Sequence, residues 1–449
     1  MDIYRNLVNY CRIKNPARCW FDYPPTYLLS RKIDFKDIKK SVYRLINSKE
    51  KYGLYVNIPF CKTRCAYCMY YSEVIPKSDV EKKVDIYLDA LAREIESYNI
   101  NFKKRKTRHL YIGGGTPLLL NPKQLKRLFE IIYKNFVFTS TSQFTIEGRP
   151  GDFTQEKLEI LVKNKINRVT LGIQSFDEDT LRRVGRNCTV KEIYDAFKEV
   201  RRAGIKYINT DIIVGLPGES KKKYQKTINH LLKLSPECIS CTRILYGQRV
   251  NIPKKDQVLD KALDRDYSFF DEIFRQNNYL PIENKEGVYL KGGLLEANNK
   301  LLFDNLNYSA YILGIGARAI SYLSDVRYAT NKVDDYIGAF ENSKNTNYYG
   351  MFLDKDDSMR QYIILQLYLL QKIKLKDFSD KFKTDLLKVY KKEIDDLEKN
   401  DLIKIDRDAG LIALLDKNID LKDFFYNMLK YLYKRDYLDK IIKMALARE

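Results

Sequence analysis

The sequence predicts an α/β protein whose main domain is a partial barrel of six β–α repeats. Between residues 51 and 245, short apolar runs alternate six times with longer amphipathic runs, as expected for parallel strands covered by helices. Six repeats are too few to close an eight-stranded barrel, so we expect an open one. The polar and glycine residues that could do chemistry follow or end the strands, which is where barrel enzymes place their sites.

The elements of the repeats follow from local signals. Apolar runs predict strands, and residues that cap helices well mark most helix starts. The strands are expected at residues 54–58, 110–112, 144–147, 169–173, 207–214 and 238–245. The helices are expected to begin near Asp79, Pro122, Thr154, Asp177, Thr189 and Glu219.

The end of the alternation at residue 245 suggests four parts. They are an N-terminal extension (1–50), the partial barrel (51–245), an accessory segment that completes the active site (246–345) and a small helical, winged-helix-like domain (346–449). In the last part we expect an apolar helix over residues 359–370. Residues 402–405 and 411–414 are expected to form a two-stranded wing.

Composition limits the class of protein. The chain has 45% apolar and 31% charged residues, which is typical of a globular protein. It has no run of the ~20 apolar residues that a membrane span needs, and its first residues lack the pattern of a secretory signal. We therefore expect a cytoplasmic protein, in which eight cysteines indicate metal binding or catalysis before disulfides. Two histidines exclude a site of three His ligands.

The formal net charge of +21 raises the question of an anionic partner. The clearest basic cluster, Lys103 to Lys106, is not interleaved with aromatic residues, and no RNA-binding signature is present. A general bias of the amino-acid composition toward lysine explains the positive charge equally well. Nucleic acid is therefore the least favoured partner, and a carboxylate-bearing small molecule is the better use of local positive charge.

Three cysteines carry the main chemical signal. Cys61, Cys65 and Cys68 lie in one short loop after the first strand, with C-x3-C-x2-C spacing. Thiolates at such spacing can hold an iron–sulfur cluster, and three ligands on a cubane leave one iron open for catalysis. Zinc is a weaker alternative because the loop offers no fourth Cys or His. A second pair, Cys238 and Cys241, lies on a predicted strand where an odd separation places the two side chains on opposite faces, which disfavours a chelate.

Other strand ends also carry polar or glycine residues. Gly113 to Thr116 follow the second strand, Glu147 ends the third, Gln174 follows the fourth and Asp211 lies in the fifth. Each alone could be an ordinary cap or salt bridge. Because the carboxyl ends of parallel strands meet at one mouth, we expect all of them to converge there.

The cysteine motif together with the β–α repeats resembles the radical S-adenosylmethionine superfamily. In that superfamily a [4Fe–4S] cluster binds S-adenosylmethionine at its open iron and cleaves it to a 5′-deoxyadenosyl radical. Further motifs resemble the branch of oxygen-independent coproporphyrinogen III oxidase and its relatives, the HemN-like and HemW-like proteins, over about residues 51–430. These motifs are NIPFC, GGGTP, LGIQSFD, Gly185-Arg186, DIIVGLPGES and a late GxGAxAIS.

The resemblance assigns roles to residues of this sequence. It implies that the cysteine loop holds the cluster, that the glycine turn receives the methionine amino group and that Arg186 binds the methionine carboxylate. Glu147 corresponds to a cofactor-binding Glu, and Ile320 to a residue beside a second S-adenosylmethionine. The cofactor-binding residues expected on this basis are Tyr55, Tyr67, Gly114, Gly115, Thr116, Glu147, Gln174, Arg186, Asp211 and Ile320; no residue is assigned as catalytic.

Three departures narrow the resemblance. The oxidase carries a further Cys two residues after the third ligand, where this chain has Tyr70. The haem-chaperone branch usually has His where Asn57 stands. Residues 147–150 read E-G-R-P in place of the usual E-x-N-P, which is more similar to anaerobic haem-degrading methylating enzymes. Those enzymes and the class C methyltransferases are thought to use two S-adenosylmethionine molecules, one for the radical and one as methyl or methylene donor.

The sequence thus favours a radical enzyme that acts on a tetrapyrrole or another flat, conjugated molecule, as a methyltransferase or an oxidoreductase. A haem-binding chaperone that keeps the cluster is the alternative, and RNA modification is a third hypothesis that rests on charge alone. The resemblance also implies an electron donor such as flavodoxin or ferredoxin.

Overall fold

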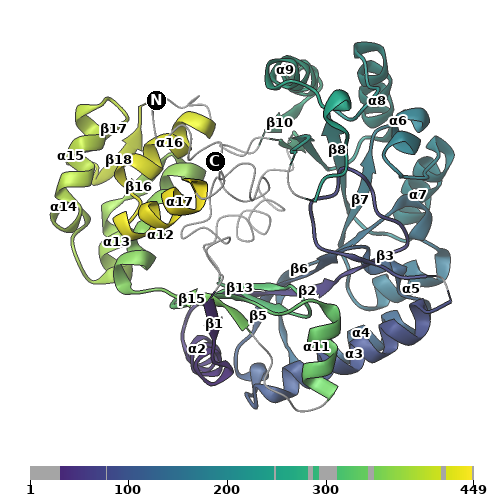
Figure 1. Cartoon of the computed structure of the whole chain (residues 1–449), viewed down its shortest axis with the longest axis horizontal. Coiled ribbons are helices and arrows are strands. Elements are labelled where there is room, and N and C mark those ends of the chain that lie inside the picture. The colour runs from purple at the N-terminus through teal and green to yellow at the C-terminus, as the bar shows by residue number, and fades with distance from the viewer. Residues whose placement is uncertain are drawn as a thin grey trace. The chain divides into compact units, whose positions relative to one another are not determined.

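The computed structural model describes residues 31–76, 78–246, 249–281, 287–292, 311–341, 348–415 and 421–446. Its contacts divide the chain into two compact units. The barrel unit contains the described residues between Arg31 and Met351, and the C-terminal unit contains those from Phe352 onward. Figure 1 shows both units. No helix among the described residues is both long enough and apolar enough to cross a membrane.

Six β–α repeats form the centre of the barrel unit, as predicted. Figure 1 shows the helices of these repeats along the outer side of a curved sheet. The strands are β2 (Tyr52–Ile58), β5 (Thr107–Gly114), β6 (Phe138–Gly148), β7 (Arg168–Gln174), β8 (Tyr207–Val214) and β9 (Cys238–Arg243). The helices are α3 (Val80–Ser97), α4 (Pro122–Asn135), α5 (Gln155–Lys163), α6 (Glu178–Arg183), α7 (Val190–Arg202), α8 (Lys221–Leu234) and α9 (Asp260–Gln276).

The six strands are parallel and neighbour one another in chain order. The predicted open barrel is therefore confirmed. Further strands extend the same sheet at both ends. Beyond β2 lie β12 (Tyr311–Ile315, parallel to β2), β13 (Ile320–Tyr322), β14 (Val326–Ala329), β15 (Tyr348–Phe352) and β1 (Arg31–Ile33), and beyond β9 lie β11 (Val288–Lys291) and β10 (Tyr279–Pro281).

Local sequence explains why the helices begin where they do. Asn121 and Gln124 form a reciprocal capping box at the start of α4, where Pro122 occupies the first turn. Thr189 and Glu192 form the same arrangement at α7. These caps satisfy backbone N–H groups that have no partner inside the helix, so the predicted helix starts hold at both places.

Residues 31–50, predicted as part of a separate extension, belong to the barrel unit. Helix α2 (Phe35–Asn47) buries Ile38, Val42 and Leu45 in the common core. The Ser41 hydroxyl donates a hydrogen bond to Asp325 at 3.0 Å, which ties the helix to the segment after β13. Apolar spacing on α2 could have indicated this packing, whereas Trp20 and the rest of residues 1–30 lie outside the described residues.

The C-terminal unit is helical with a small sheet, in keeping with the predicted winged-helix-like domain. The predicted wing strands are β17 (Ile403–Asp406) and β18 (Leu411–Leu414), and a third strand, β16 (Lys372–Lys374), pairs with β18. The helices are α12 (Lys355–Leu370), α13 (Leu375–Phe382), α14 (Leu386–Val389), α15 (Lys391–Lys399), α16 (Leu421–Tyr431) and α17 (Arg435–Leu446).

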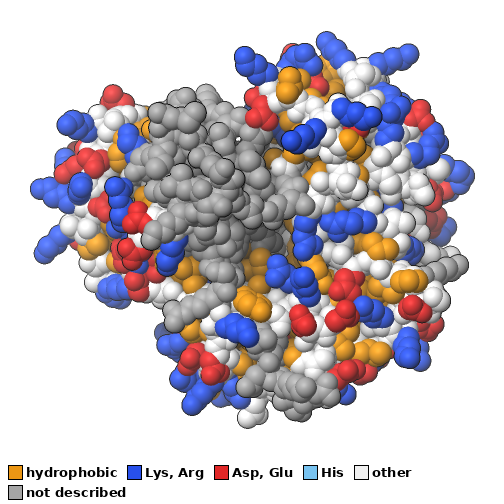
Figure 2. Space-filling model, in the orientation of Figure 1, with side chains coloured by type: hydrophobic (Ala, Val, Ile, Leu, Met, Phe, Trp, Pro, Cys, Tyr) orange, Lys and Arg blue, Asp and Glu red, His pale blue; other side chains and the backbone are white. Residues whose placement is uncertain are grey.

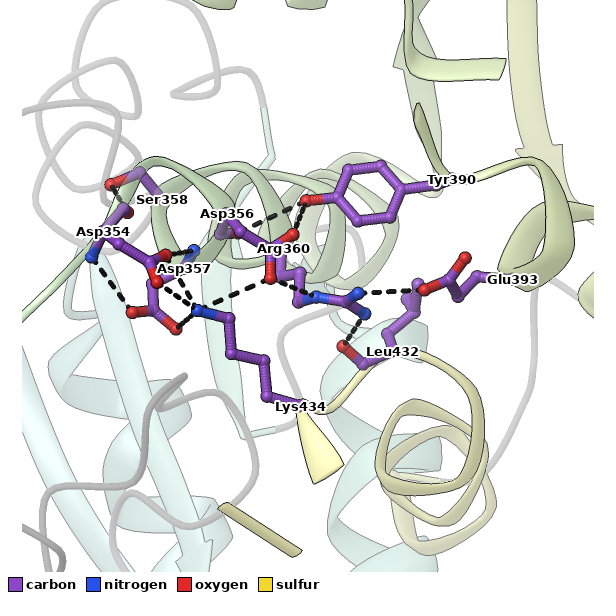
Figure 3. Close-up of polar contacts among 9 residues, drawn as sticks. All are labelled: Asp354, Asp356, Asp357, Ser358, Arg360, Tyr390, Glu393, Leu432 and Lys434. Carbon is purple, nitrogen blue, oxygen red and sulfur yellow. Dashed lines mark hydrogen bonds and ion pairs between the residues drawn. The ribbon is translucent and has the colours of Figure 1, made fainter. Parts of the chain in front are cut away.

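A network of charged groups connects the helices of the C-terminal unit (Figure 3). Arg360 on α12 donates to Asp356 at 3.0 Å, to Glu393 on α15 at 2.9 Å and to the carbonyl oxygen of Leu432 at 2.9 Å. Lys434 lies 2.7 Å from Asp354, the N-cap residue of α12. The network therefore ties α15 and the segment between α16 and α17 to the N-terminal half of α12.

Candidate active site

The cysteine loop is closed at its base by two short strands. β3 (Phe60–Cys61) pairs in parallel with β4 (Glu73–Val74), so the chain leaves and re-enters the barrel at nearly the same place. Inside the loop, Ala66 donates its N–H to the carbonyl oxygen of Val184 at 2.9 Å and accepts one from Asn251 at 2.7 Å. These contacts hold the loop over the ends of the strands.

The three thiols face the same region. Cys65 is buried, and Cys61 and Cys68 are half-buried. Burial raises the pKa of the Cys68 thiol, and the neighbouring Cys61 and Cys65 contribute to the rise. Three crowded thiolates are unfavourable by themselves, whereas bound iron would stabilise all three. The donor set therefore fits a cluster.

The described residues do not form a site for a single metal ion. Within the described ranges, no three His, Cys, Asp or Glu side chains surround one point where an ion could bind. A cubane cluster does not require this arrangement, because its thiolate ligands bind different irons. Among the described residues, the three cysteines therefore suit an iron–sulfur cluster rather than a single zinc ion.

The glycine turn after β5 lies against the cysteine loop. Gly114 has φ +123°, and a Cβ atom on Gly115 would come within 2.5 Å of the Phe60 carbonyl oxygen. No larger residue fits at Gly115 without moving that backbone. The next residue, Thr116, is buried and its hydroxyl lies 3.5 Å from the Cys61 sulfur. The structure thus brings Gly114, Gly115 and Thr116 to the cysteine loop.

Arg186 reaches the cysteine loop from the other side. Its side chain is 5% exposed, and its Nη1 lies 3.2 Å from the Tyr67 hydroxyl and 3.9 Å from the Cys65 sulfur. Its Nη2 donates to the Gly172 carbonyl oxygen. Its Nε is buried without a hydrogen-bond partner in the described part of the chain. A buried, partly unsatisfied guanidinium beside the cluster loop fits a carboxylate ligand.

Glu147 and Asp211 lie deeper in the mouth. Tyr111 donates to Glu147 at 2.5 Å, and Asn209 donates to Asp211 at 2.9 Å. Burial raises the pKa of Glu147 to about 7 and that of Asp211 to about 6, although the hydrogen bonds oppose the rise. The charge of Arg168 also lowers both pKa values, so this arginine belongs to the site.

Gln174, Tyr55 and Ile320 complete the expected set. Gln174 ends β7 with φ +76°, which is uncommon for a residue with a side chain, and it is 8% exposed. Tyr55 stacks on Tyr111 with ring centroids 5.9 Å apart. Ile320 begins β13, and its backbone packs directly against Gly314 of β12.

Asn57 connects the end of β2 to the turn that follows the neighbouring strand β12. Its amide donates to the Ala317 carbonyl oxygen at 2.6 Å and accepts from the Tyr55 hydroxyl at 3.1 Å. Tyr87 bridges the same two segments, donating to the Asn57 carbonyl oxygen at 2.7 Å and accepting from the Ala317 N–H at 3.0 Å. The turn at Gly316 and Ala317 is thus tied to the strand that precedes the cluster loop.

Sequence reasoning missed Arg168, Tyr111 and Glu94. Glu94 on α3 is fully buried and accepts from the Gly316 N–H at 2.7 Å and from the Tyr336 hydroxyl at 2.6 Å. Burial raises the pKa of Glu94 to about 7. A charged residue on the apolar face of a predicted helix was the signal that could have found it.

Comparison with known proteins identifies two domains in the chain. The model of the radical SAM superfamily matches residues 55–231, and that of the HemN C-terminal domain matches residues 353–420. The chain therefore contains a radical SAM domain and a HemN C-terminal domain, and its relatives include HemW and oxygen-independent coproporphyrinogen III oxidase.

Two relatives and one solved structure define this branch. Heme chaperone HemW of Lactococcus lactis is 29% identical over 375 residues, which cover 82% of this chain and 94% of that protein. Oxygen-independent coproporphyrinogen III oxidase of Escherichia coli is 28% identical over 343 residues, which cover 70% of this chain and 71% of that protein. The structure of coproporphyrinogen III oxidase (HemN) from Escherichia coli has the same fold, with a TM-score of 0.78 and 22% identity over 90% of this chain and 95% of that one.

Proposed function

We propose that this chain cleaves S-adenosylmethionine at a [4Fe–4S] cluster and acts on a tetrapyrrole or another flat, conjugated molecule. The observation that carries the proposal is the set of three thiols in one loop with the buried guanidinium of Arg186 beside them. The radical SAM domain supports the cluster and S-adenosylmethionine as cofactors. The names of the relatives support a haem-related small molecule as substrate.

The residues of the mouth divide the work. Bound cluster and S-adenosylmethionine would supply reductive cleavage of the sulfonium and a carbon-centred radical. Cys61, Cys65 and Cys68 would hold the cluster. The fork of Arg186 suits the methionine carboxylate, and the backbone of the turn at Gly114 and Gly115 would receive the amino group.

Glu147 would hold the ribose hydroxyls or the amino group of the cofactor. Its raised pKa keeps part of its population protonated near neutral pH, so it can donate as well as accept a hydrogen bond. Tyr111 orients it from the next strand at 2.5 Å.

Methyl or methylene transfer is the reaction that the departures support. Tyr70 stands two residues after Cys68, where the oxidase would have a further Cys. The tie between Asn57 and Ala317 brings the segment before Ile320 to the mouth, which supports a second S-adenosylmethionine there. In this proposal one molecule serves the radical and the other serves as donor.

A haem chaperone is the second candidate. The match to HemW covers 82% of this chain, more than the 70% covered by the match to the Escherichia coli oxidase. A chaperone would keep the cluster loop but would not turn over S-adenosylmethionine. On the face shown in Figure 2, Lys and Arg side chains are scattered among Asp and Glu rather than gathered in one stripe, so this face adds no support for RNA as substrate.

The test is anaerobic reconstitution of the full chain, followed by reaction with S-adenosylmethionine, a strong reductant and haem as the probe. We expect about four irons per chain and joint formation of 5′-deoxyadenosine and S-adenosylhomocysteine. Cys61→Ala should lose iron and both products. Cys238→Ala is the matched control, because Cys238 is buried among Val288 and Leu290 near the opposite end of the sheet.

Other outcomes of this experiment would favour a different function. Stoichiometric haem binding without 5′-deoxyadenosine would favour the chaperone. 5′-Deoxyadenosine without S-adenosylhomocysteine would favour oxidation over methyl transfer. Iron content below two per chain that Cys61→Ala leaves unchanged would overturn the cluster itself.

A further inference from the structure

Three arginines from distant parts of the sequence meet beside the cysteine loop. Arg64 lies inside the loop, Arg249 follows β9, and Arg318 lies in the turn between β12 and β13. The guanidinium carbons of Arg249 and Arg318 lie 5.0 and 5.8 Å from the centre of the Tyr71 ring. Arg64 donates to the carbonyl oxygens of Cys68 and Arg249 at 3.2 and 3.1 Å. We refer to Arg64, Arg249 and Arg318 as the arginine cluster.

No carboxylate among the described residues neutralises the positive charge of the arginine cluster. None of the three arginines forms an ion pair with a carboxylate in the described residues. Glu73 comes near through Tyr71, which donates to it at 2.6 Å, but its other oxygen accepts from Lys83 at 2.9 Å. Burial and the charges of Arg318 and Arg64 lower the pKa of Arg249, so the three cations repel one another.

The backbone at Arg318 is also costly. It has φ +60°, in the left-handed region that residues with a side chain rarely adopt, at a cost of about 1 kcal/mol or more. A glycine there would avoid this cost. The turn is nevertheless held in place, because the Arg318 N–H donates to the Asn331 carbonyl oxygen at 3.0 Å and Glu94 holds the preceding Gly316. A strained arginine beside two others indicates an anionic ligand whose binding offsets both the backbone strain and the repulsion among the three cations.

We propose that the arginine cluster, positioned by Tyr71, binds the carboxylate side chains of the substrate and so holds the substrate beside the cysteine loop. Guanidinium groups pair with carboxylates through two parallel hydrogen bonds, and the Tyr71 ring holds the guanidinium groups of Arg249 and Arg318 near each other. Arg186 lies apart, against Cys65 and Gly172, and serves the cofactor. The inference rests on the proposed function and names the substrate as a polycarboxylate with a conjugated ring.

The test compares two probes on the reconstituted full chain: haem, which carries two carboxylates, and haem dimethyl ester, which carries the same ring with the charges removed. Binding is followed by the haem absorbance. Wild-type protein should bind haem about ten- to a hundredfold more tightly than the ester. Arg249→Met and Arg318→Gly should remove most of that difference, and Arg318→Gly also relieves the backbone cost. Arg202→Met, on the outer surface of α7, is the control and should bind like wild type.

Several results would overturn this assignment. Equal affinity of wild-type protein for haem and its ester would do so without any variant. Loss of iron in Arg249→Met and Arg318→Gly while haem binding persists would mean that the arginines serve the iron–sulfur cluster. Competition with haem by inorganic phosphate but not by propionate would replace the carboxylate with a phosphate. Failure of the proposed function can be distinguished from failure of this inference. The first would appear as absence of 5′-deoxyadenosine, whereas the ratio of the affinities for haem and its ester would still test the role of the arginines.

Discussion

The carboxylates at the barrel mouth and those of the C-terminal unit have pKa values that are shifted in opposite directions. Burial raises the pKa of Glu147 to about 7 and that of Asp211 to about 6. In the C-terminal unit burial also acts, but hydrogen bonds from Lys434 hold the pKa of Asp354 below its ordinary value, and those from Tyr390 and Arg360 do the same for Asp356 (Figure 3). The carboxylates of the C-terminal network are paired with cations of the same unit, whereas Glu147 and Asp211 have less compensation from neighbouring positive charge.

This difference separates a structural polar network from a binding site. A network that exists for stability pairs its charges, because an unpaired buried charge costs several kcal/mol. A site that awaits a charged ligand keeps part of its hydrogen-bonding capacity open. The orphaned Nε of Arg186 and the strained Arg318 follow the same logic as Glu147. Substitutions should therefore harm function without harming stability at the mouth, and the reverse in the C-terminal unit.

The largest effect is expected from Glu147→Gln. The change keeps the shape of the side chain and removes its negative charge, so hydrogen bonds from the cofactor lose their charged acceptor. We expect the rate of 5′-deoxyadenosine formation at low S-adenosylmethionine to fall about a hundredfold. The free energy of unfolding of the protein without cofactor should not decrease at pH 8, where the wild-type carboxylate is ionised and poorly solvated. A loss of stability equal to the loss of activity would make Glu147 a structural residue.

Arg360→Met should show the reverse. It leaves Asp356 and Glu393 without their shared cation, and we expect the C-terminal unit to lose about 3 kcal/mol at pH 7. Because the pKa of Asp356 is lowered in the folded chain, the stability that the pair contributes is present above its unfolded pKa and is lost as the pH falls through its folded pKa. The difference from wild type should therefore shrink below about pH 4.

Hydrogen exchange of the full chain can measure this effect by segment. Peptides from α12 and α15 should exchange faster in Arg360→Met, while iron content and exchange at β5 and β6 stay as in wild type. Lys399→Met, an exposed change at the end of α15, is the control and should alter stability by less than about 0.5 kcal/mol. Faster exchange throughout the barrel unit would show that the network supports more than its own unit.

The sequence predicted the barrel and most of the mouth because both depend on local patterns. Strand and helix periodicity gave the six repeats, and the motifs after the strands gave Cys61 to Cys68, the glycine turn and Glu147. The missed features depend on contacts between distant segments. Glu94 holds Gly316 across more than two hundred residues, and the arginine cluster joins residues 64, 249 and 318. Local sequence patterns do not reveal contacts between residues so far apart in the chain. Residues 31–50 were predicted to be a separate extension for the same reason.

The smallest effect is expected from Asp211→Asn, and it tests the comparison most directly. Because the folded pKa of Asp211 is raised to about 6, the folded state holds its proton more tightly than the unfolded state does. Its contribution to stability is therefore complete below the unfolded pKa of about 4 and is lost as the pH rises to about 6. Asp211→Asn should remove that slope, so the free energies of unfolding in urea at pH 4.5 and pH 7 should differ by about 2 kcal/mol less than in wild type. A slope that grows in the variant would mean that Asp211 is paired as Asp356 is, and the distinction between the two regions would not hold at this residue.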